Sequence, residues 1–184
     1  MDENPYHADG IQRGLISEDL LKFRWLDEIA LSPDGNRVAY TVRHPHVENN
    51  GYITHVYVRE LRAAATERLT SGVVSTSSLA WSHDSLRLAY AVSVGEHHAV
   101  RIWSQADGST QEYPITGEPL TGLDWSPDGK RLVGVRWTPL RHPEDRSAAP
   151  GIPAPTIKVV RRLRYKQDGS GWVHNRFLQV WTLD

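Results

Sequence analysis

Serine, aspartate and arginine recur at fixed spacing in this sequence, and these residue types can carry nucleophilic or acid–base chemistry. The three serines are Ser32, Ser82 and Ser126; an aspartate lies two residues after each serine and an arginine three residues after the aspartate. A serine nucleophile of the α/β-hydrolase type sits in a Gly-x-Ser-x-Gly turn, and the sequence contains no such motif. Because a catalytic group is needed once and these groups recur, we expect turn and strand-edge roles and no catalytic residue in this chain.

The histidines are the second candidates for chemistry. Two pairs stand close in sequence, His44-Pro-His46 and His97-His98. Two histidines can contribute to a zinc site, but closed sites have four ligands, and no further ligand is suitably spaced here. The sequence also lacks His-Glu-x-x-His, a phosphate-binding glycine loop and an EF-hand loop. We therefore predict histidines in surface loops between strands, with no metal and no cofactor.

An internal repeat positions these residues. Residues 29–40, 79–90 and 123–134 each read as an apolar-x-apolar pair, a Ser-x-Asp turn and a second apolar strand. The serines are 50 and 44 residues apart (82 − 32 and 126 − 82), slightly longer than the ~40–45 residues of a four-stranded propeller blade. The apolar pairs, Ile29/Leu31, Leu79/Trp81 and Leu123/Trp125, have the alternation of half-buried strands. Each copy thus predicts a β-hairpin.

The turn of the hairpin is Ser-Pro-Asp-Gly in the first and third copies, where proline fixes φ and glycine accepts a positive φ. The second copy has His83 and Ser85 at these positions, so we expect a slightly different turn there.

Two further strands should complete each blade. Residues 56–58, 101–103 and 179–181 read as third strands, and residues 68–70 and 113–115 read as short fourth strands. Pro114 suits an edge strand, where a missing N–H costs little. Three residues follow Trp181, too few for a fourth strand in blade three. The fold class is all-β: a partial β-propeller of about three four-stranded blades, of an expected seven, preceded by a short N-terminal helix.

The boundaries divide the chain into an N-terminal arm (1–16), a short helix and lead-in (17–28) and propeller blades one to three (29–184). Ser17 is the expected helix N-cap, with Glu18 and Asp19 in the first turn. The helix either packs on the propeller or bridges to a second domain. A propeller closes with roughly four to eight blades, so we expect either a processed piece of a longer precursor, still docked to its other half, or an artificial truncation; we favour processing.

An insertion (138–171) separates the second and third strands of blade three. Its cations (Lys158, Arg161, Arg162, Arg164 and Lys166) fall within nine residues. A solvated or salt-bridged face is the commoner explanation for such a run. The sharper interpretation is a basic lip at a tunnel or domain interface that meets a carboxylate, with substrate- or interface-binding residues Arg161, Arg162, Arg164 and Tyr165.

Composition excludes several function classes. The 184 residues carry a net charge of −1, which argues against nucleic-acid or anionic-membrane partners. No apolar run approaches the ~20 residues that span a bilayer. The absence of cysteine excludes disulfides, thiolate catalysis and thiolate metal sites. The acidic, polar first ten residues are unlike a secretory signal, so we expect a cytoplasmic protein.

Two segments carry a family resemblance. Residues 17–35 (Ser-Glu-Asp-Leu-Leu-Lys-Phe-Arg-Trp-Leu-Asp-Glu-Ile-Ala-Leu-Ser-Pro-Asp-Gly) resemble the start of the propeller in acylaminoacyl peptidases and their dipeptidyl-peptidase relatives. Residues 161–172 (Arg-Arg-Leu-Arg-Tyr-Lys-Gln-Asp-Gly-Ser-Gly-Trp), which lead into Arg176-Phe-Leu-Gln-Val-Trp, are similar to a third-blade segment of the same enzymes. The resemblance covers residues 17–184 and points to the acylaminoacyl-peptidase branch of the prolyl oligopeptidase family. The Ser-Pro-Asp-Gly blades alone also occur in TolB-like propellers.

The resemblance implies a serine exopeptidase in which a seven-bladed propeller caps a C-terminal α/β-hydrolase domain. The hydrolase would remove acylated amino acids or short N-terminal units from peptides, while the propeller admits only short, unstructured substrates. No catalytic residue can be assigned here, because the matching segment is not in this chain. The implied partners are the rest of the precursor, short peptides and further copies in a homo-oligomer. The alternative is a non-enzymatic TolB-like propeller that serves as a protein-interaction module.

Overall fold

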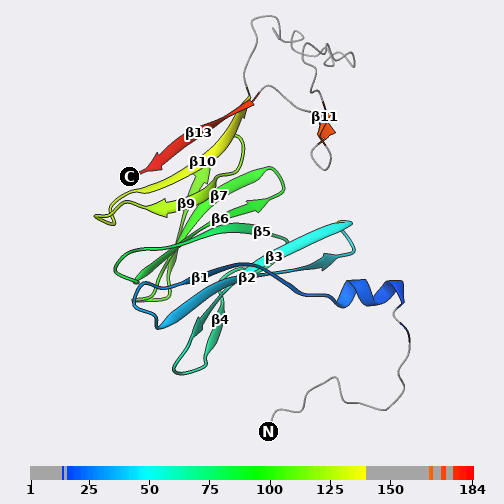
Figure 1. Cartoon of the computed structure of the whole chain (residues 1–184), viewed down its shortest axis with the longest axis horizontal. Helices are drawn as coiled ribbons and strands as arrows, with labels where there is room; N and C mark the ends of the chain where they lie inside the picture. Colours follow the sequence, from blue (N-terminus) through cyan, green and yellow to red (C-terminus); the bar gives the residue numbers. More distant parts are fainter. Residues whose placement is uncertain (1–13, 15, 140–165, 168–170, 173–175) are drawn as a thin grey trace, which may run out of the picture.

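Strands account for nearly all of the regular secondary structure. The computed structural model describes residues 14, 16–139, 166–167, 171–172 and 176–184. Within them, three antiparallel sheets stand side by side along the chain (Figure 1). The first sheet holds β1 (Trp25–Leu31), β2 (Arg37–His46), β3 (Gly51–Glu60) and β4 (Thr66–Arg68) in that order. The second holds β5 (Ser75–Trp81), β6 (Arg87–Val94), β7 (His97–Ser104) and β8 (Thr110–Ile115).

The third sheet has three strands, β9 (Thr121–Trp125), β10 (Leu132–Pro139) and β13 (Arg176–Leu183). Between β10 and β13, two short strands, β11 (Lys166–Gln167) and β12 (Gly171–Trp172), pair with each other. The described residues contain no fourth strand beside β13. The all-β fold and the partial propeller are therefore as the sequence predicts, and we call the three sheets blades one to three.

The blades converge at their first strands. β5 contacts both β1 and β9, whereas β4 contacts only β3 and β8 only β7 among the described elements. Sheets that touch at the first strand and separate at the fourth form wedges, which is the geometry of propeller blades. β1, β5 and β9 therefore mark the inner side of the arc.

Two apolar seams join the blades. The first packs Ala39, Val56 and Val58 of blade one against Trp81, Leu88, Tyr90 and Trp103 of blade two. The second packs Ala80, Ala89, Ala91 and Val100 of blade two against Leu120, Leu123, Trp125 and Leu132 of blade three. Alternation along the strands explains the arrangement, because one side of each pleated sheet carries small residues and the side that meets it carries large ones. Both faces of blade two are buried in this way.

One strand prediction needs correction. The fourth strand of blade one is β4, two residues earlier than the predicted 68–70, although Leu69 still donates its N–H to the Val56 carbonyl at 2.9 Å. The predicted third strands all lie within β3, β7 and β13, and residues 113–115 lie within β8. Pro114 is on the edge strand, as predicted.

The N-terminal helix is a 3₁₀ helix, η1 (Ser17–Lys22), that contacts β2. Ser17 is not its N-cap. The cap is Ile16, whose backbone N–H donates to the Asp19 carboxylate at 3.2 Å, while the Ser17 hydroxyl lies 3.2 Å from Glu18. The Asp19 carboxylate in the acidic first turn thus makes the capping hydrogen bond in place of the Ser17 hydroxyl.

The apolar pair of blade one is also placed differently from its counterparts. Ile29 and Leu31 are 66% and 60% exposed, whereas Trp81, the counterpart of Leu31, is buried in the first seam. Ile29 and Leu31 belong to the side of blade one that faces away from blade two. Val180 (69% exposed) and Leu178 lie on the side of blade three that faces away from blade two. Both lateral faces of the arc thus expose apolar side chains.

Candidate functional site

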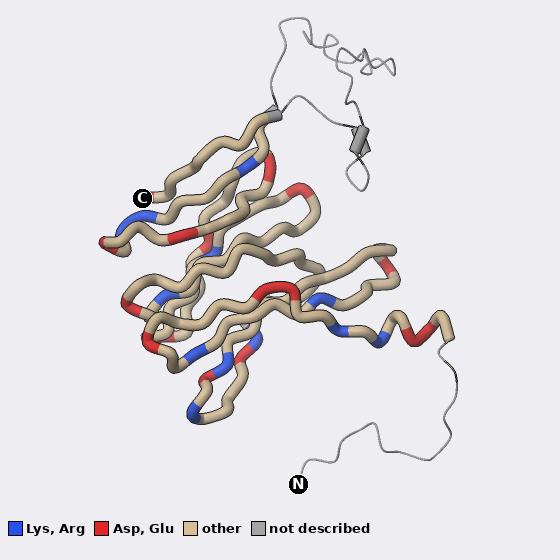
Figure 2. The backbone as a smooth tube through the Cα atoms, viewed as in Figure 1, with Lys and Arg blue, Asp and Glu red and all other residues tan. Residues whose placement is uncertain are grey.

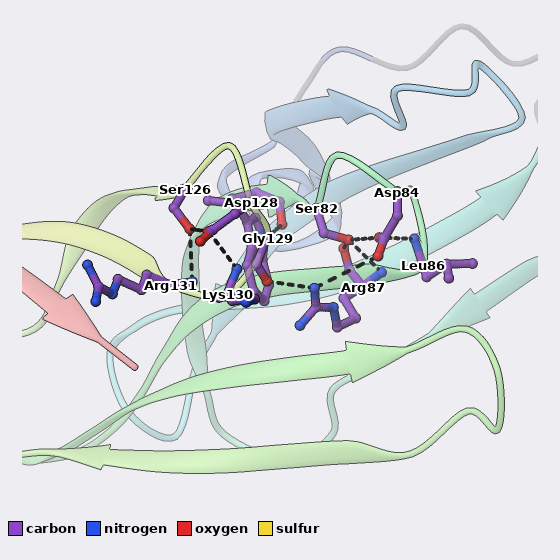
Figure 3. A network of polar contacts seen from close by, with 11 residues as sticks. Ser82, Asp84, Leu86, Arg87, Ser126, Asp128, Gly129, Lys130 and Arg131 are labelled. Carbon is purple, nitrogen blue, oxygen red and sulfur yellow. Dashed lines mark hydrogen bonds and ion pairs between the residues drawn. The ribbon is translucent and has the colours of Figure 1, made fainter.

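The recurrent serines and aspartates form three equivalent turns at one end of the blades, and Figure 3 shows two of them. The serine hydroxyl lies 2.6, 2.5 and 2.6 Å from the aspartate Oδ1 in blades one, two and three. The same hydroxyl oxygen accepts the backbone N–H of the repeat arginine at 2.9 Å in every copy. Each serine is therefore occupied inside its turn.

These hydrogen bonds also control the ionisation of the turn carboxylates. The hydroxyl of Ser32, followed by the backbone N–H of Asn36, lowers the pKa of Asp34 to about 2. The hydroxyls of Ser82 and Ser126 are likewise the largest causes that lower the pKa of Asp84 and Asp128. A carboxylate held ionised in this way stabilises a turn and is a poor proton donor. The structural interpretation of the repeated aspartates is confirmed.

The turn of blade two has the same geometry as the other two, which corrects the expectation of a different turn. Ser85 takes the left-handed conformation, with φ of 62° against 68° for Gly35 and 66° for Gly129. Its buried hydroxyl accepts the backbone N–H of Asp34, in the turn of blade one, at 3.0 Å. The strain of a left-handed backbone at Ser85 is therefore offset by a hydrogen bond between blades one and two.

The repeat arginine of blade two makes a similar link to blade three (Figure 3). Arg87 donates through Nη2 to the Gly129 carbonyl at 2.8 Å, and its guanidinium lies 4.4 Å from the centre of the Trp125 ring. A cation over an indole face is attractive when partly desolvated. At this end of the arc the turns of neighbouring blades are therefore bonded to one another.

The first strands carry a second set of links between blades. The indole N–H of Trp81 donates to the Ala30 carbonyl at 3.0 Å, and that of Trp125 to the Ala80 carbonyl at 3.1 Å. Each first strand also has an irregularity in its register, at 26–29, at 77–80 and in the part of β9 that pairs with Val133 and Val135.

At two of these irregularities, a side chain accepts a hydrogen bond from a backbone N–H of the next blade. Glu28 accepts the N–H of Leu79 at 3.1 Å, and Ser78 accepts the N–H of Gly122 at 2.9 Å. The inner wall is therefore built from bonds that run from each blade to the one before it. Neither Glu28 nor Ser78 was predicted to have a role, because the partner lies 51 or 44 residues away.

The opposite end of blade one carries an exposed aromatic cluster, formed by Phe23, Trp25, Tyr52 and Arg43. Ring centres of Phe23 and Trp25 are 5.8 Å apart, and those of Trp25 and Tyr52 are 5.7 Å apart, both edge-on. The Arg43 guanidinium lies 5.3 Å from the centre of the Tyr52 ring and pairs with Asp27 at 3.1 Å. Tyr52 is 59% exposed. This cluster lies beside η1, at the tip of the β2–β3 hairpin (Figure 1).

The predicted loop histidines lie in strands. His44 and His46 belong to β2, and His97 and His98 belong to β7, because these strands extend well beyond their apolar centres. Another histidine, His55 on β3, is buried, and the sequence analysis did not single it out. Its Nδ1 lies 3.1 Å from the Thr70 hydroxyl, and its ring centre is 5.7 Å from that of His44.

Burial lowers the pKa of both His44 and His55 below the usual 6.5. Arg24 adds to the effect on His44, and Arg68 adds to it on His55. Two neutral, neighbouring imidazoles could be metal ligands, but no group of three or more potential ligand side chains occurs in the part of the chain that is described. We assign them a packing role.

The charged positions of the backbone lie largely at turns and strand ends, with few where the sheets face each other (Figure 2). The proposed basic lip cannot be placed in this pattern, since Arg161, Arg162, Arg164 and Tyr165 lie outside the described residues. Among the described helices, none is long and apolar enough to cross a bilayer.

Comparisons with known proteins agree with this architecture, although no protein-family model matches the sequence. The chain is 28% identical over 166 residues to dipeptidyl-peptidase 5 of Porphyromonas endodontalis, covering 90% of this chain and 24% of that protein. It is 24% identical over 170 residues to an uncharacterized peptidase, YuxL, of Bacillus subtilis, covering 90% of this chain and 25% of the relative. The chain thus spans about a quarter of the length of the curated relatives it matches.

Among solved structures, acylaminoacyl peptidase of Pyrococcus horikoshii superposes with a TM-score of 0.68 and 16% identity. The superposition covers 91% of this chain and 24% of that one. At this identity the match concerns the fold alone.

Proposed function

We propose that this chain forms an N-terminal part of the β-propeller in a serine peptidase of the prolyl oligopeptidase family. In this role it selects short peptides for a hydrolase domain on further polypeptide. The coupled reaction is removal of N-terminal acylated amino acids or short N-terminal units. The Ser-Asp-His triad lies on the hydrolase domain, and the propeller contributes enclosure, which excludes water and folded substrates.

The observation that carries the proposal is the pair of exposed apolar lateral faces. In the seam, the Trp81 side chain is buried and its indole N–H is bonded, whereas the equivalent Leu31 is largely exposed. Val180 is exposed in the same way on blade three. Apolar faces of this kind are stabilised when covered, at about 25 cal/mol per Å², so a further blade belongs on each side of the arc.

The aromatic cluster supplies a separate surface for the hydrolase domain. Phe23, Tyr52 and the neighbouring Leu20 and Leu21 of η1 are all exposed. Exposed aromatic side chains beside an arginine are typical of interface anchors. Of the two roles expected for the helix, bridging to a second domain is the one that this surface favours.

Purification of the tagged chain from its own cells tests the proposal. We expect a polypeptide that co-purifies with it and reacts covalently with a fluorophosphonate, which marks an activated serine. The preparation should cleave N-acetyl-alanyl or dipeptidyl anilides and leave a folded protein intact. A chain that purifies without any fluorophosphonate-reactive partner would favour the non-enzymatic interaction module.

Paired variants localise the contact. Leu31→Lys places a charge on the outer face of blade one and should release the companion polypeptide. Leu61→Lys, in the exposed β3–β4 turn, is the matched control and should retain it. Equal retention by both variants would show that the outer face of blade one is not covered. The cytoplasmic location and self-association stay predictions, which cell fractionation and light scattering test.

A further inference from the structure

The tip of the β2–β3 hairpin holds the only asparagine of the sequence that is followed by glycine, Asn50-Gly51. The tip consists of residues 47–50, and the N–H of Asn50 donates to the Val47 carbonyl at 3.0 Å. Asn50 is exposed and has a left-handed backbone, with a φ of 44°. Within the described part of the chain its side-chain amide makes no hydrogen bond. This amide is therefore available to the peptide nitrogen that follows it.

The chemistry open to this pair is loss of the amide through a cyclic imide. The backbone nitrogen of Gly51 attacks Asn50 Cγ, and the bond between Cγ and the side-chain nitrogen breaks. That nitrogen leaves as ammonia, taking the proton of the glycine N–H. Water then opens the imide at one of its two carbonyls, which leaves either an aspartate or an isoaspartate, whose main chain runs through the side-chain carbons. A glycine favours the attack because no Cβ hinders the approach of its nitrogen.

Aspartates that precede glycine can form the same imide, but here they are held by hydrogen bonds. The described residues contain three such pairs, 34–35, 107–108 and 128–129. Asp34 accepts the Ser32 hydroxyl at 2.6 Å and the N–H of Asn36 at 3.1 Å. Asp107 and Asp128 accept the N–H two residues ahead at 3.0 and 3.1 Å. These bonds lower the pKa of all three carboxyl groups, and an ionised carboxylate is a poor target for a nucleophile.

The folded hairpin sets the rate at which the asparagine can react. Gly51 pairs with His46 at the end of the ladder, so its nitrogen reaches the Asn50 side chain only when the tip opens. Exposed tips open locally at a smaller free energy than the sheet behind them. Gly51 itself does not need to be glycine for the fold, because its φ is not in the left-handed region and a Cβ would lie 3.6 Å from the nearest atom, the Asn49 carbonyl oxygen.

We propose that Asn50 is a site of spontaneous deamidation in the folded protein and that its products disturb the adjacent aromatic cluster. Tyr52 of that cluster is two residues away, with its ring centre 5.7 Å from that of Trp25. An aspartate adds a negative charge beside the cluster, and an isoaspartate adds a main-chain carbon that shifts Tyr52 along the hairpin. Any effect on docking of the hydrolase domain rests on the proposed function, whereas the modification itself does not.

Incubation of the purified chain, with any companion still bound, at mildly alkaline pH tests the modification. We expect the peptide that contains Asn50 to gain the mass difference between an amide and an acid and to separate into two forms. One form should accept a methyl group from an isoaspartyl methyltransferase. Gly51→Ala is the matched variant and should react about tenfold more slowly or less, because its Cβ hinders the nitrogen. The Asp-Gly pairs of the turns are the internal control and should stay unmodified.

An Asn50 peptide that keeps its mass, or a Gly51→Ala variant that reacts as fast as the original chain, would overturn the site.

The effect on the aromatic cluster has its own measurement. Nuclear Overhauser contacts between the rings of Trp25 and Tyr52 should be lost in proportion to the isoaspartate formed. Asn50→Gly accepts the left-handed backbone without an amide, so this variant should keep the contacts through the same incubation. Contacts that persist in the fully modified chain would overturn the effect on the cluster. A fluorophosphonate-reactive companion would still support the proposed function in that case, so the two proposals fail separately.

Discussion

The two seams of the molecule share an indole–carbonyl bond between blades but are filled differently. In both, a tryptophan indole donates to the carbonyl of an alanine in the preceding blade, at 3.0 Å from Trp81 and 3.1 Å from Trp125. The first seam then buries Tyr90 completely, whereas the second has Gly134 at the equivalent position of the repeat. Directional bonds fix how the blades stand relative to each other, and the packing between them can change by a whole ring without altering that arrangement.

The largest expected effect comes from making the first seam resemble the second. Tyr90→Ala removes a fully buried ring and should lower the free energy of unfolding by about 3–5 kcal/mol. Tyr90→Phe keeps the ring and should cost less than about 1 kcal/mol, because the buried hydroxyl lacks a hydrogen-bond partner in the described region. Urea unfolding followed by tryptophan fluorescence measures both. Equal losses would mean that the hydroxyl, and not the ring, fills the seam.

The next effect separates the bond from the packing. Trp81→Phe loses indole volume and the hydrogen bond to Ala30, whereas Trp103→Phe loses volume alone, since its indole nitrogen has no partner among the described residues. Both side chains are buried in the first seam. We expect Trp81→Phe to be more destabilising by about 1 kcal/mol. Indistinguishable unfolding midpoints would show that the indole–carbonyl bond adds nothing to the seam.

A smaller effect is expected at the turn that joins blades one and two. Ser85 has a φ of 62° and accepts the N–H of Asp34. Ser85→Ala loses the bond and keeps the strain, so it should cost about 1 kcal/mol. Ser85→Gly loses the bond but relieves the left-handed backbone, a gain of about 1 kcal/mol, and should be nearly neutral. Thermal unfolding of the two variants side by side gives the difference; a glycine variant less stable than the alanine variant would contradict this account.

The smallest effect concerns pH and blade one alone. The pKa values of His44 and His55 are lowered in the folded state, chiefly by burial, so the unfolded chain binds more protons as pH falls through 6.5. Stability should be constant above that value and decline below it. Urea midpoints at pH 7.5 and 5.5 measure the decline, which a His44→Gln, His55→Gln double variant should flatten. His97→Gln, at the exposed first position of β7, serves as the control variant.

The hairpins could be predicted from sequence because their causes are local. A Ser-x-Asp turn closes within six residues, through bonds from the serine to the aspartate and to the arginine N–H, so the pattern carries the structure. The second turn shows the limit of this reasoning. Ser85 replaces glycine because of a hydrogen bond to Asp34, 51 residues earlier, and no local rule reports such a partner.

The candidate interfaces were less accessible to sequence reasoning. Phe23, Tyr52 and Arg43 come together only when the β2–β3 hairpin returns beside the first strand. His55 was missed because a single histidine within an apolar strand has no distinguishing pattern. The basic run around Arg161 was predicted from its charge alone, and its role stays a prediction.

The bonds between the first strands of the blades have a direction, since donors on blades two and three reach acceptors on the blade before them. A blade can therefore follow any blade whose first strand offers an equivalent backbone carbonyl to its tryptophan indole. If the residues of blade two were excised at its boundaries, the indole of Trp125 would find the carbonyl of Ala30 where it now meets Ala80. Because of this equivalence, a propeller can gain or lose a blade by duplication or deletion without new hydrogen bonds between blades.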